Sequence, residues 1–292
     1  MQIVTDSGAD LSPAQRLGIT VHSVPLVLTL DGKTYRSGVD IQPDEFYKLL
    51  AASKNFPITS QPSPAEFSDL YRTVAETDPE ILSIHISSGL SGTMNAARLG
   101  ASMVPEAKVT FVDTKTLSAA EGWQVEAAAR AVQLGWPLDR ILAALHKISE
   151  ATDTIYTLAT LRYLVHGGRI SHLRGLLGQL LEIKPAISVE KTEGKYVQRG
   201  TARTLSKAIK MLPDLIAHQH SPGTPLRAQI VHGDNPDGVA ALKEALEGKF
   251  PIQWVPTMDV APALGAHTGA GLIGVAYGPA VAFSGLEEVL VS

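Results

Sequence analysis

The sequence contains no cysteine, and several other features that mark particular protein classes are scarce. Without cysteine, disulfide frameworks, thiolate metal sites and cysteine nucleophiles are excluded. Lys and Arg number 25 against 29 Asp and Glu, so no basic surplus is present to neutralise a nucleic-acid backbone. Aromatic residues make up only 5 % of the chain, which predicts that any apolar cavity is lined mainly by aliphatic side chains.

Long apolar runs are also missing. No stretch approaches the roughly 18 residues that a membrane-spanning helix needs. The first residues, from Met1 to Asp6, show neither the basic nor the apolar region of a signal peptide. We therefore expect a cytoplasmic protein without a membrane span. With 292 residues, of which 45 % are hydrophobic, the chain is long enough for two domains with cores of their own.

Short β-rich segments alternate with helical segments in the first half of the chain. Strands are expected at 3–4, 81–86 and 109–112, and the helical patterns cover 43–52, 64–76, 94–102, 119–134 and 138–149. Such alternation is typical of a parallel sheet with helices on both faces. Asp31-Gly32 between two β-rich runs indicates a hairpin, which we place as an excursion near residues 24–37.

The pattern changes after about residue 152. β-rich segments flank Thr192-Glu193-Gly194, which indicates a second hairpin, and residues 226–255 show a strand, a helix and another strand. Hairpins mixed with crossovers predict a mixed sheet. The fold class is therefore α/β, with an N-terminal parallel-sheet α/β/α domain over 1–152 and a C-terminal mixed-sheet α+β domain over 153–292.

Three segments expected to be loops carry the polar side chains of interest. The first, 55–62, contains Thr59 and Ser60 between two prolines; the second, 87–93, follows a strand and contains Ser91. Ligands of parallel α/β sheets bind at such strand ends, and a Gly/Ser loop entering a helix suits an anion. Ordinary turns and helix caps are the alternative interpretation of both loops.

The third segment, 263–271, surrounds His267 with small residues. A histidine held in this way can donate to a carboxylate or a phosphate, and a purely structural histidine bonded to backbone is the alternative. Gly269, Gly271 and Gly274 match a dinucleotide-binding pattern in letters only, because they lead into an expected strand instead of a helix.

One set of short segments spans nearly the whole chain in a fixed order: 4–7, 59–64, 87–93, 112–114, 167–170, 184–185, Arg203 and 265–269. In these segments the chain resembles the DegV family of lipid-binding proteins, which includes the fatty-acid-binding subunits of bacterial fatty acid kinase.

The resemblance implies a site and its partners. A long-chain fatty acid would lie in a buried apolar pocket, with Thr59 and Ser91 bonding its carboxylate and His267 beside them. Arg169 and Arg203 would face a separate ATP-binding kinase subunit, which phosphorylates the carboxylate for phospholipid metabolism. Neither a cofactor nor a metal is implied beyond the fatty acid itself.

Two other functions stay open from the sequence. Ser91 and His267 could serve a stand-alone serine hydrolase, although the sequence contains no information on the geometry that defines such a site. The chain could also be a regulatory module that senses lipid.

Overall fold

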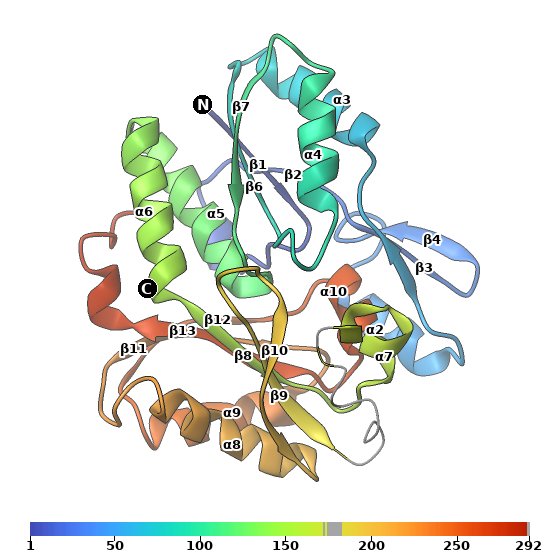
Figure 1. Cartoon of the computed structure of the whole chain (residues 1–292), viewed down its shortest axis with the longest axis vertical. Helices are drawn as coiled ribbons and strands as arrows, with labels where there is room; N and C mark the ends of the chain where they lie inside the picture. Colours follow the sequence, from blue (N-terminus) through green and yellow to red (C-terminus); the bar gives the residue numbers. More distant parts are fainter. Residues whose placement is uncertain (172, 174–182, 291–292) are drawn as a thin grey trace.

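The computed structural model describes residues 1–171, 173 and 183–290. Within these residues the strands form a parallel sheet in the N-terminal half, a mixed sheet in the C-terminal half and a small antiparallel sheet beside them (Figure 1). This arrangement confirms the predicted fold class. No helix in the described ranges is both long and apolar enough to cross a membrane.

The N-terminal sheet is parallel throughout, in the order β2-β1-β6-β7. Its strands are β1 (Gln2–Asp6), β2 (His22–Val24), β6 (Glu80–His85) and β7 (Lys108–Asp113). Two helices, α3 (Pro64–Ala75) and α4 (Thr93–Ser102), pack on this sheet, and α5 (Ser118–Gln133) also contacts it. The short α1 (Pro13–Arg16) follows β1, and α6 (Leu138–Ala151) packs on α5.

Local sequence chemistry explains where α3 begins. Ser63 caps the helix by accepting from the backbone N–H of Glu66, and the Glu66 carboxylate accepts from the backbone N–H of Ser63. Pro64 occupies the first helical position, where no backbone N–H is needed. Ser12 and Gln15 repeat this capping box at α1.

The predicted hairpin is present and belongs to the small antiparallel sheet, in the order β4-β3-β5. Strands β3 (Val27–Leu30) and β4 (Lys33–Arg36) are joined by Asp31 and Gly32, with positive φ angles of 51° and 76° as a tight hairpin requires. β5 (Ile58–Ser60) corrects an expectation: residues 55–62 are not irregular throughout. Pairing with β3 satisfies the backbone between the two prolines, and α2 (Pro43–Ala52) connects β4 to β5.

The C-terminal sheet has the order β10-β9-β8-β13-β11-β12, and only β11 and β12 pair in parallel. Its strands are β8 (Asp153–Thr157), β9 (Lys184–Val189), β10 (Tyr196–Ala202), β11 (Leu226–His232), β12 (Ile252–Asp259) and β13 (Ile273–Pro279). Helices α8 (Leu205–Ala217) and α9 (Pro236–Glu247) cover it, and α7 (Arg162–His166) and η2 (Ala280–Phe283) lie in its connections.

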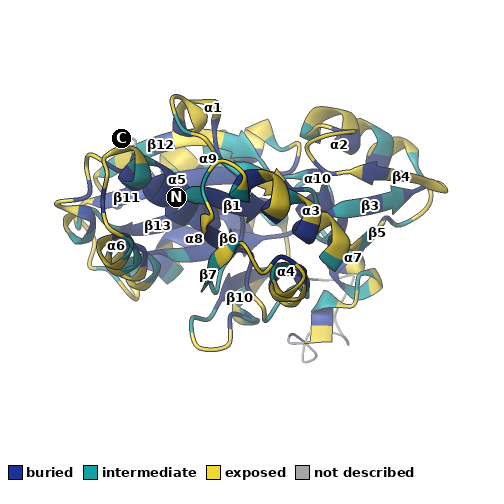
Figure 2. Cartoon of the chain, turned by 90° about the horizontal axis from the view of Figure 1, so that it is seen from above, coloured by how far each residue is buried: buried dark blue, intermediate teal, exposed yellow. Residues whose placement is uncertain are grey.

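Helix α5 lies between the two large sheets. It contacts β1 and β6 of the parallel sheet and β11 and β13 of the mixed sheet, and every residue from Ser118 to Ala129 is buried. A helix buried all round is largely apolar, and alanine is the commonest residue of α5, with Glu121, Gln124 and Glu126 as buried polar exceptions. Figure 2 shows the contrast with α4 and α6, whose outer faces are exposed. The predicted domain boundary at 152/153 stays a prediction.

The segment around His267 also differs from the sequence-based expectation. Residues Pro262–Thr268 form a helix, α10, and not a loop. Pro262 occupies its first turn, and Gly269 ends it with a φ of 72°, a backbone conformation that glycine adopts without strain. His267 therefore projects from the last turn of a helix that packs on α2 and α7.

Candidate functional site

Thr59 and His267 meet although 208 residues separate them in the chain. Pairing of β5 with β3 sets Thr59 opposite Leu28, and α10 carries His267 to the same place. The Oγ1 atom of Thr59 lies 2.7 Å from Nε2 of His267. Two segments that looked like loops in the sequence thus form one hydrogen-bonded pair on regular structure.

The His267 ring is held in its neutral form. Burial lowers its pKa from 6.5 to about 4, and the nearby positive charge of Arg169 acts in the same direction. Nδ1 is buried and has no hydrogen-bond partner among the described residues. A buried N–H without an acceptor is rarer than an unpaired acceptor, so we assign the proton to Nε2. His267 then donates to Thr59, which leaves the threonine hydroxyl proton free for another acceptor.

Ser91 lies in the turn between β6 and α4. Its Oγ is 2.8 Å from Oγ1 of Thr93 and accepts from the backbone N–H of Thr93. Gly92, the residue that caps α4, has no side chain for this purpose. Ser91 therefore lies at the N-terminus of α4, where the positive end of the helix dipole favours a bound anion.

Arg169 joins these three side chains around one pocket. Its Nη1 donates to the carbonyl oxygen of Gly167 at 2.7 Å, and the side chain is half-buried. Thr59, Ser91, Arg169 and His267 all line this pocket, together with Leu26, Ser60, Gln61, Ile86, Leu90, Leu117, Tyr196, Ala263 and Leu264. The polar groups thus converge from four separate segments, and the other walls are largely apolar.

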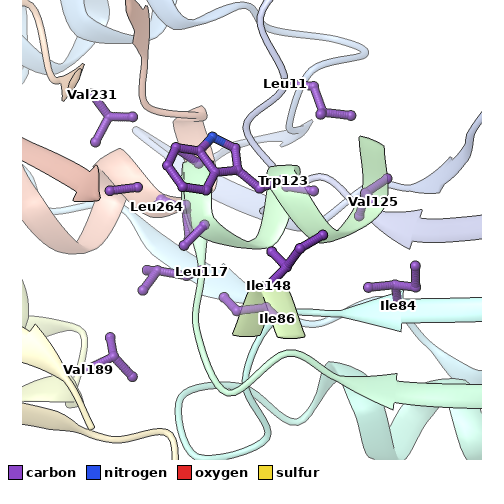
Figure 3. Close-up of a cluster of buried hydrophobic side chains, with 14 of the residues drawn as sticks. Leu11, Ile84, Ile86, Leu117, Trp123, Val125, Ile148, Val189, Val231 and Leu264 are labelled. Carbon is purple, nitrogen blue, oxygen red and sulfur yellow. The ribbon is translucent and has the colours of Figure 1, made fainter. Parts of the chain in front are cut away.

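An inner cavity continues from this pocket toward the core. Leu117, Tyr196 and Leu264 line both spaces. The inner lining is otherwise formed by Ser118, Tyr156, Ile187, Val260, Thr268 and Leu272. Figure 3 shows Leu117 and Leu264 within the apolar cluster that also contains Trp123. The two spaces together form a path with a polar end and an apolar end.

The free space along this path is small: about 40 Å³ in the outer pocket and about 20 Å³ in the inner cavity. Pockets that enclose small molecules hold roughly 300–1,000 Å³. A ligand of that size enters only if the walls move apart. These walls come from the N-terminal half, through Leu117, and from the C-terminal half, through Tyr196 and Leu264.

The polar end also opens outward. Ser91 and Arg169 line a second, more open cleft of about 320 Å³, whose other residues are Ser88, Gly89, Leu90, Gly92, Gly168 and Ser171. A group held by Ser91 and Arg169 is therefore reachable from the surface. Arg203, by contrast, is exposed just before α8 and lines neither space. The expectation that Arg169 and Arg203 both face a kinase subunit stays a prediction.

The geometry of a serine hydrolase is not formed by Ser91 and His267. In the described part of the chain, Ser91 pairs with Thr93, and the Nε2 of His267 pairs with Thr59. A Ser–His–Asp chain does occur elsewhere, at Ser83, His85 and Asp6. The side chains of Ser83 and His85 are completely buried, so no substrate reaches the serine.

Sequence reasoning had no means of finding Tyr196, which lines both spaces from β10. Sequence reasoning also missed Gln61. The Gln61 side chain lies so close to Gly92 that a Cβ added to Gly92 would be 2.0 Å from Oε1 of Gln61. The one available signal was the glycine itself, since a position without a Cβ permits close approach.

Comparison with known proteins relates the chain to one protein family. The family model described as "Uncharacterised protein, DegV family" matches residues 1–280. A DegV domain-containing protein of Deinococcus radiodurans is 34 % identical over 277 residues, which is 95 % of each chain. Another, from Lactococcus lactis, is 36 % identical and covers 93 % of this chain and 96 % of its own.

Solved structures agree with these sequence relatives. A DegV family protein of Thermus thermophilus, described by its fatty acid binding, has a TM-score of 0.84 and 34 % identity and covers 95 % of this chain and 99 % of its own. DegV of Bacillus subtilis, described as a fatty acid binding protein, has a TM-score of 0.84 and 28 % identity, with 95 % and 98 % covered. The chain belongs to the DegV family.

Proposed function

We propose that this member of the DegV family binds a long-chain fatty acid, with the carboxylate at Thr59, Ser91, Arg169 and His267 and the acyl chain in the cavity behind them. The observation that carries the proposal is that a pocket with polar groups and an apolar inner cavity adjoin, since Leu117, Tyr196 and Leu264 line both. The fatty acid binding described for the relatives from Thermus thermophilus and Bacillus subtilis supports the same ligand class.

The polar end suits a carboxylate. A buried carboxylate is costly unless hydrogen bonds or an opposite charge compensate for lost water. Thr59 offers a hydroxyl proton because its oxygen already accepts from His267, Ser91 offers a second hydroxyl, and Arg169 supplies the positive charge. His267 is neutral near pH 7 and so orients Thr59 without adding charge.

The apolar end supplies most of the affinity. Burying roughly 15 methylene groups at about 0.8 kcal/mol each contributes on the order of 12 kcal/mol before entropic costs. Such a ligand remains bound during purification. Because the walls must separate to admit the chain, we expect exchange to be slow compared with binding to an open surface pocket.

We further propose that the protein presents the carboxylate to a separate ATP-dependent kinase subunit in the cytoplasm. A carboxylate oxygen would attack the γ-phosphorus of ATP, the bond from that phosphorus to the bridging oxygen of ADP would break, and an acyl phosphate would form. The open cleft beside Ser91 and Arg169 supports this, because it joins the polar end to the surface. Arg203, exposed before α8, is our candidate for a contact with the kinase.

Lipid extraction is the direct test of binding. The purified protein is denatured and extracted, and the extract is analysed by mass spectrometry. We expect a near-stoichiometric long-chain fatty acid from the wild type and less from a Thr59→Val/Ser91→Ala variant. Ser88→Ala is the matched control, since Ser88 lies in the same turn but lines only the outer cleft. An empty wild-type extract, with no uptake on incubation, would overturn the proposal.

The kinase role has its own experiment. Loaded protein, ATP and a purified fatty acid kinase subunit are incubated, and acyl phosphate is trapped with hydroxylamine. We expect Arg203→Ala to lower the yield without changing the lipid content, and Lys210→Ala, an exposed residue of α8, to leave both unchanged. No acyl phosphate despite bound lipid would favour a lipid-sensing module. Labelling of Ser91 by a fluorophosphonate would favour a hydrolase.

A further inference from the structure

Asp10 is a buried carboxyl group that the proposed function does not use. It lies in the segment between β1 and α1, and only 3 % of the residue is exposed. It lines neither the polar pocket nor the inner cavity. Burying such a group requires compensation by specific partners, so the identity of its partners indicates what it does.

Its partners belong to two distant segments. Oδ2 accepts from the hydroxyl of Ser118 at 2.5 Å, and Oδ1 accepts from the backbone N–H of Ala261 at 3.0 Å. These residues are 108 and 251 positions further along the chain. Ser118 is the first residue of α5, and Ala261 immediately precedes α10. One carboxyl group thus ties the starts of two helices together.

The contact with Ser118 holds a strained backbone. Ser118 has a φ of 58°, a left-handed conformation that side chains other than glycine rarely adopt. The backbone N–H of Ser118 also donates to the carbonyl oxygen of Gly8 at 3.0 Å. The segment that contains Gly8 and Asp10 therefore holds Ser118 through two hydrogen bonds. Ser118 lines the inner cavity, and its neighbour Leu117 lines both spaces. This strained turn therefore sets one wall of the path.

The contact with Ala261 sets the facing wall. Ala261 lies directly before the first turn of α10. Along this stretch Val260 and Leu264 line the inner cavity, and Leu264 and His267 line the polar pocket. A shift of the start of α10 would move the apolar wall and the Thr59–His267 pair together.

We propose that Asp10 is a positioning residue for lipid binding, which holds the Leu117 wall and the α10 wall at a fixed separation. This inference rests on the proposed function. The geometry behind it is that one carboxyl group bonds directly to both walls, to Ser118 on one side and to Ala261 on the other. Since the walls must part to admit or release an acyl chain, the two hydrogen bonds oppose opening and slow release.

The test measures release directly. cis-Parinaric acid, a fluorescent long-chain fatty acid, is loaded into the protein, and its displacement by excess oleic acid is followed by stopped-flow fluorescence. Loss of the two bonds in Asp10→Ala is expected to raise the dissociation rate constant roughly tenfold to a hundredfold. Asp10→Asn keeps an acceptor for Ala261 and gains a donor for Ser118, so its rate is expected within about threefold of the wild type.

Glu126→Ala is the matched control for general destabilisation. Glu126 is a fully buried carboxylate of the same helix, α5, and accepts from Gln15 and Arg130. It lines neither lipid space. Its loss is expected to lower the thermal unfolding temperature as much as Asp10→Ala does, with the dissociation rate unchanged.

The possible outcomes separate the two hypotheses. If the wild type takes up no parinaric acid, the proposed function fails. If the wild type binds it and Asp10→Ala releases it no faster than Glu126→Ala does, the positioning role is overturned. Should Asp10→Ala not fold, Ser118→Ala replaces it, because this variant removes one of the two bonds. Its rate is expected to lie between those of the wild type and the Asp10→Ala prediction, and an unchanged rate would contradict the proposal.

Discussion

Two buried histidines of this protein illustrate how similar chemistry is used in two ways. His85 bonds through both ring nitrogens, to Asp6 and to Ser83, and is completely buried. His267 bonds through one nitrogen to Thr59, at the edge of a pocket, and its other nitrogen has no partner among the described residues. A saturated network stabilises a core, whereas an unsaturated one keeps hydrogen-bonding capacity for a ligand.

The strongest way to break this comparison is to remove each ring. His85→Ala is expected to lower the free energy of unfolding by about 3–5 kcal/mol, because a cavity opens and two buried polar partners lose their bond. His267→Ala is expected to cost only about 1 kcal/mol but to release the lipid. Urea unfolding of lipid-free protein and extraction of bound lipid measure the two effects. Equal stability losses would mean that the two networks do not differ in role.

The pH dependence of stability is a second test of the environment of His267. The folded-state pKa of His267 is lowered from 6.5 to about 4, so the unfolded chain binds more protons in this window. Stability from this group is therefore present above pH 6.5 and is lost as the pH falls toward 4, by on the order of 3 kcal/mol. His267→Gln should remove this loss in unfolding experiments at several pH values.

Asp10 contributes to the same profile with the opposite sign. Burial raises its pKa from 3.8 to about 7, so the folded state binds more protons than the unfolded chain. Its contribution is present below pH 4 and is lost as the pH rises through 7. The Asp10→Asn variant therefore removes one opposing contribution, so stability should fall more steeply toward pH 4 in this variant than in the wild type, and a profile that is not steeper would contradict this sign.

A substitution at Gly167 tests the position of the His267 ring without replacing His267 itself. A Cβ at Gly167 would lie 2.1 Å from Nδ1 of His267, so Gly167→Ala must displace the ring. We expect fatty acid binding to weaken roughly tenfold to a hundredfold, since the bond to Thr59 is lost. Gly168→Ala is the control: its φ of 73° makes alanine strained, but nothing lies within 4 Å. Stability should fall and binding persist, and equal weakening by both variants would contradict the contact.

The smallest effects are expected from two single hydroxyls. Ser91→Ala removes one proposed carboxylate donor and should weaken binding about tenfold, with a loss of about 0.5–1 kcal/mol in the free energy of unfolding because the bond to the Thr93 N–H at the start of α4 is lost. Ser83→Ala breaks the bonds from Ser83 to Tyr71 and His85, which lie inside the core. It should lower stability by about 1–3 kcal/mol and leave binding unchanged. Both variants are measured by titration with parinaric acid and by urea unfolding. Weaker binding in Ser83→Ala than in Ser91→Ala, or a larger loss of stability in Ser91→Ala, would contradict these roles.

Local elements followed closely from the sequence. The helix expected over 64–76 begins with a capping box of Ser63 and Glu66, whose partners all lie within three residues. Asp31 and Gly32 form the predicted turn because their own backbone preferences select it. The order of strands and helices in the N-terminal half likewise predicted the parallel sheet with helices on both faces, since a crossover between parallel strands requires them.

The two wrong expectations share a physical cause. Ile58–Ser60 becomes a strand because β3 satisfies its backbone, a partner that local propensity cannot reveal. Pro262–Thr268 becomes a helix because it packs against α2 and α7 from other parts of the chain, although its glycine weakens helix propensity. Tertiary contacts overrode local preference in both.

The sequence by itself determined the fold class, the family and the identities of Thr59, Ser91 and His267 as residues worth attention. Only the tertiary structure decided that Thr59 bonds to His267, that Arg169 shares their pocket and that Asp10 joins the walls behind it. The reason is that periodicity and capping depend on neighbours in the chain, whereas a binding site depends on distances between segments up to 251 residues apart.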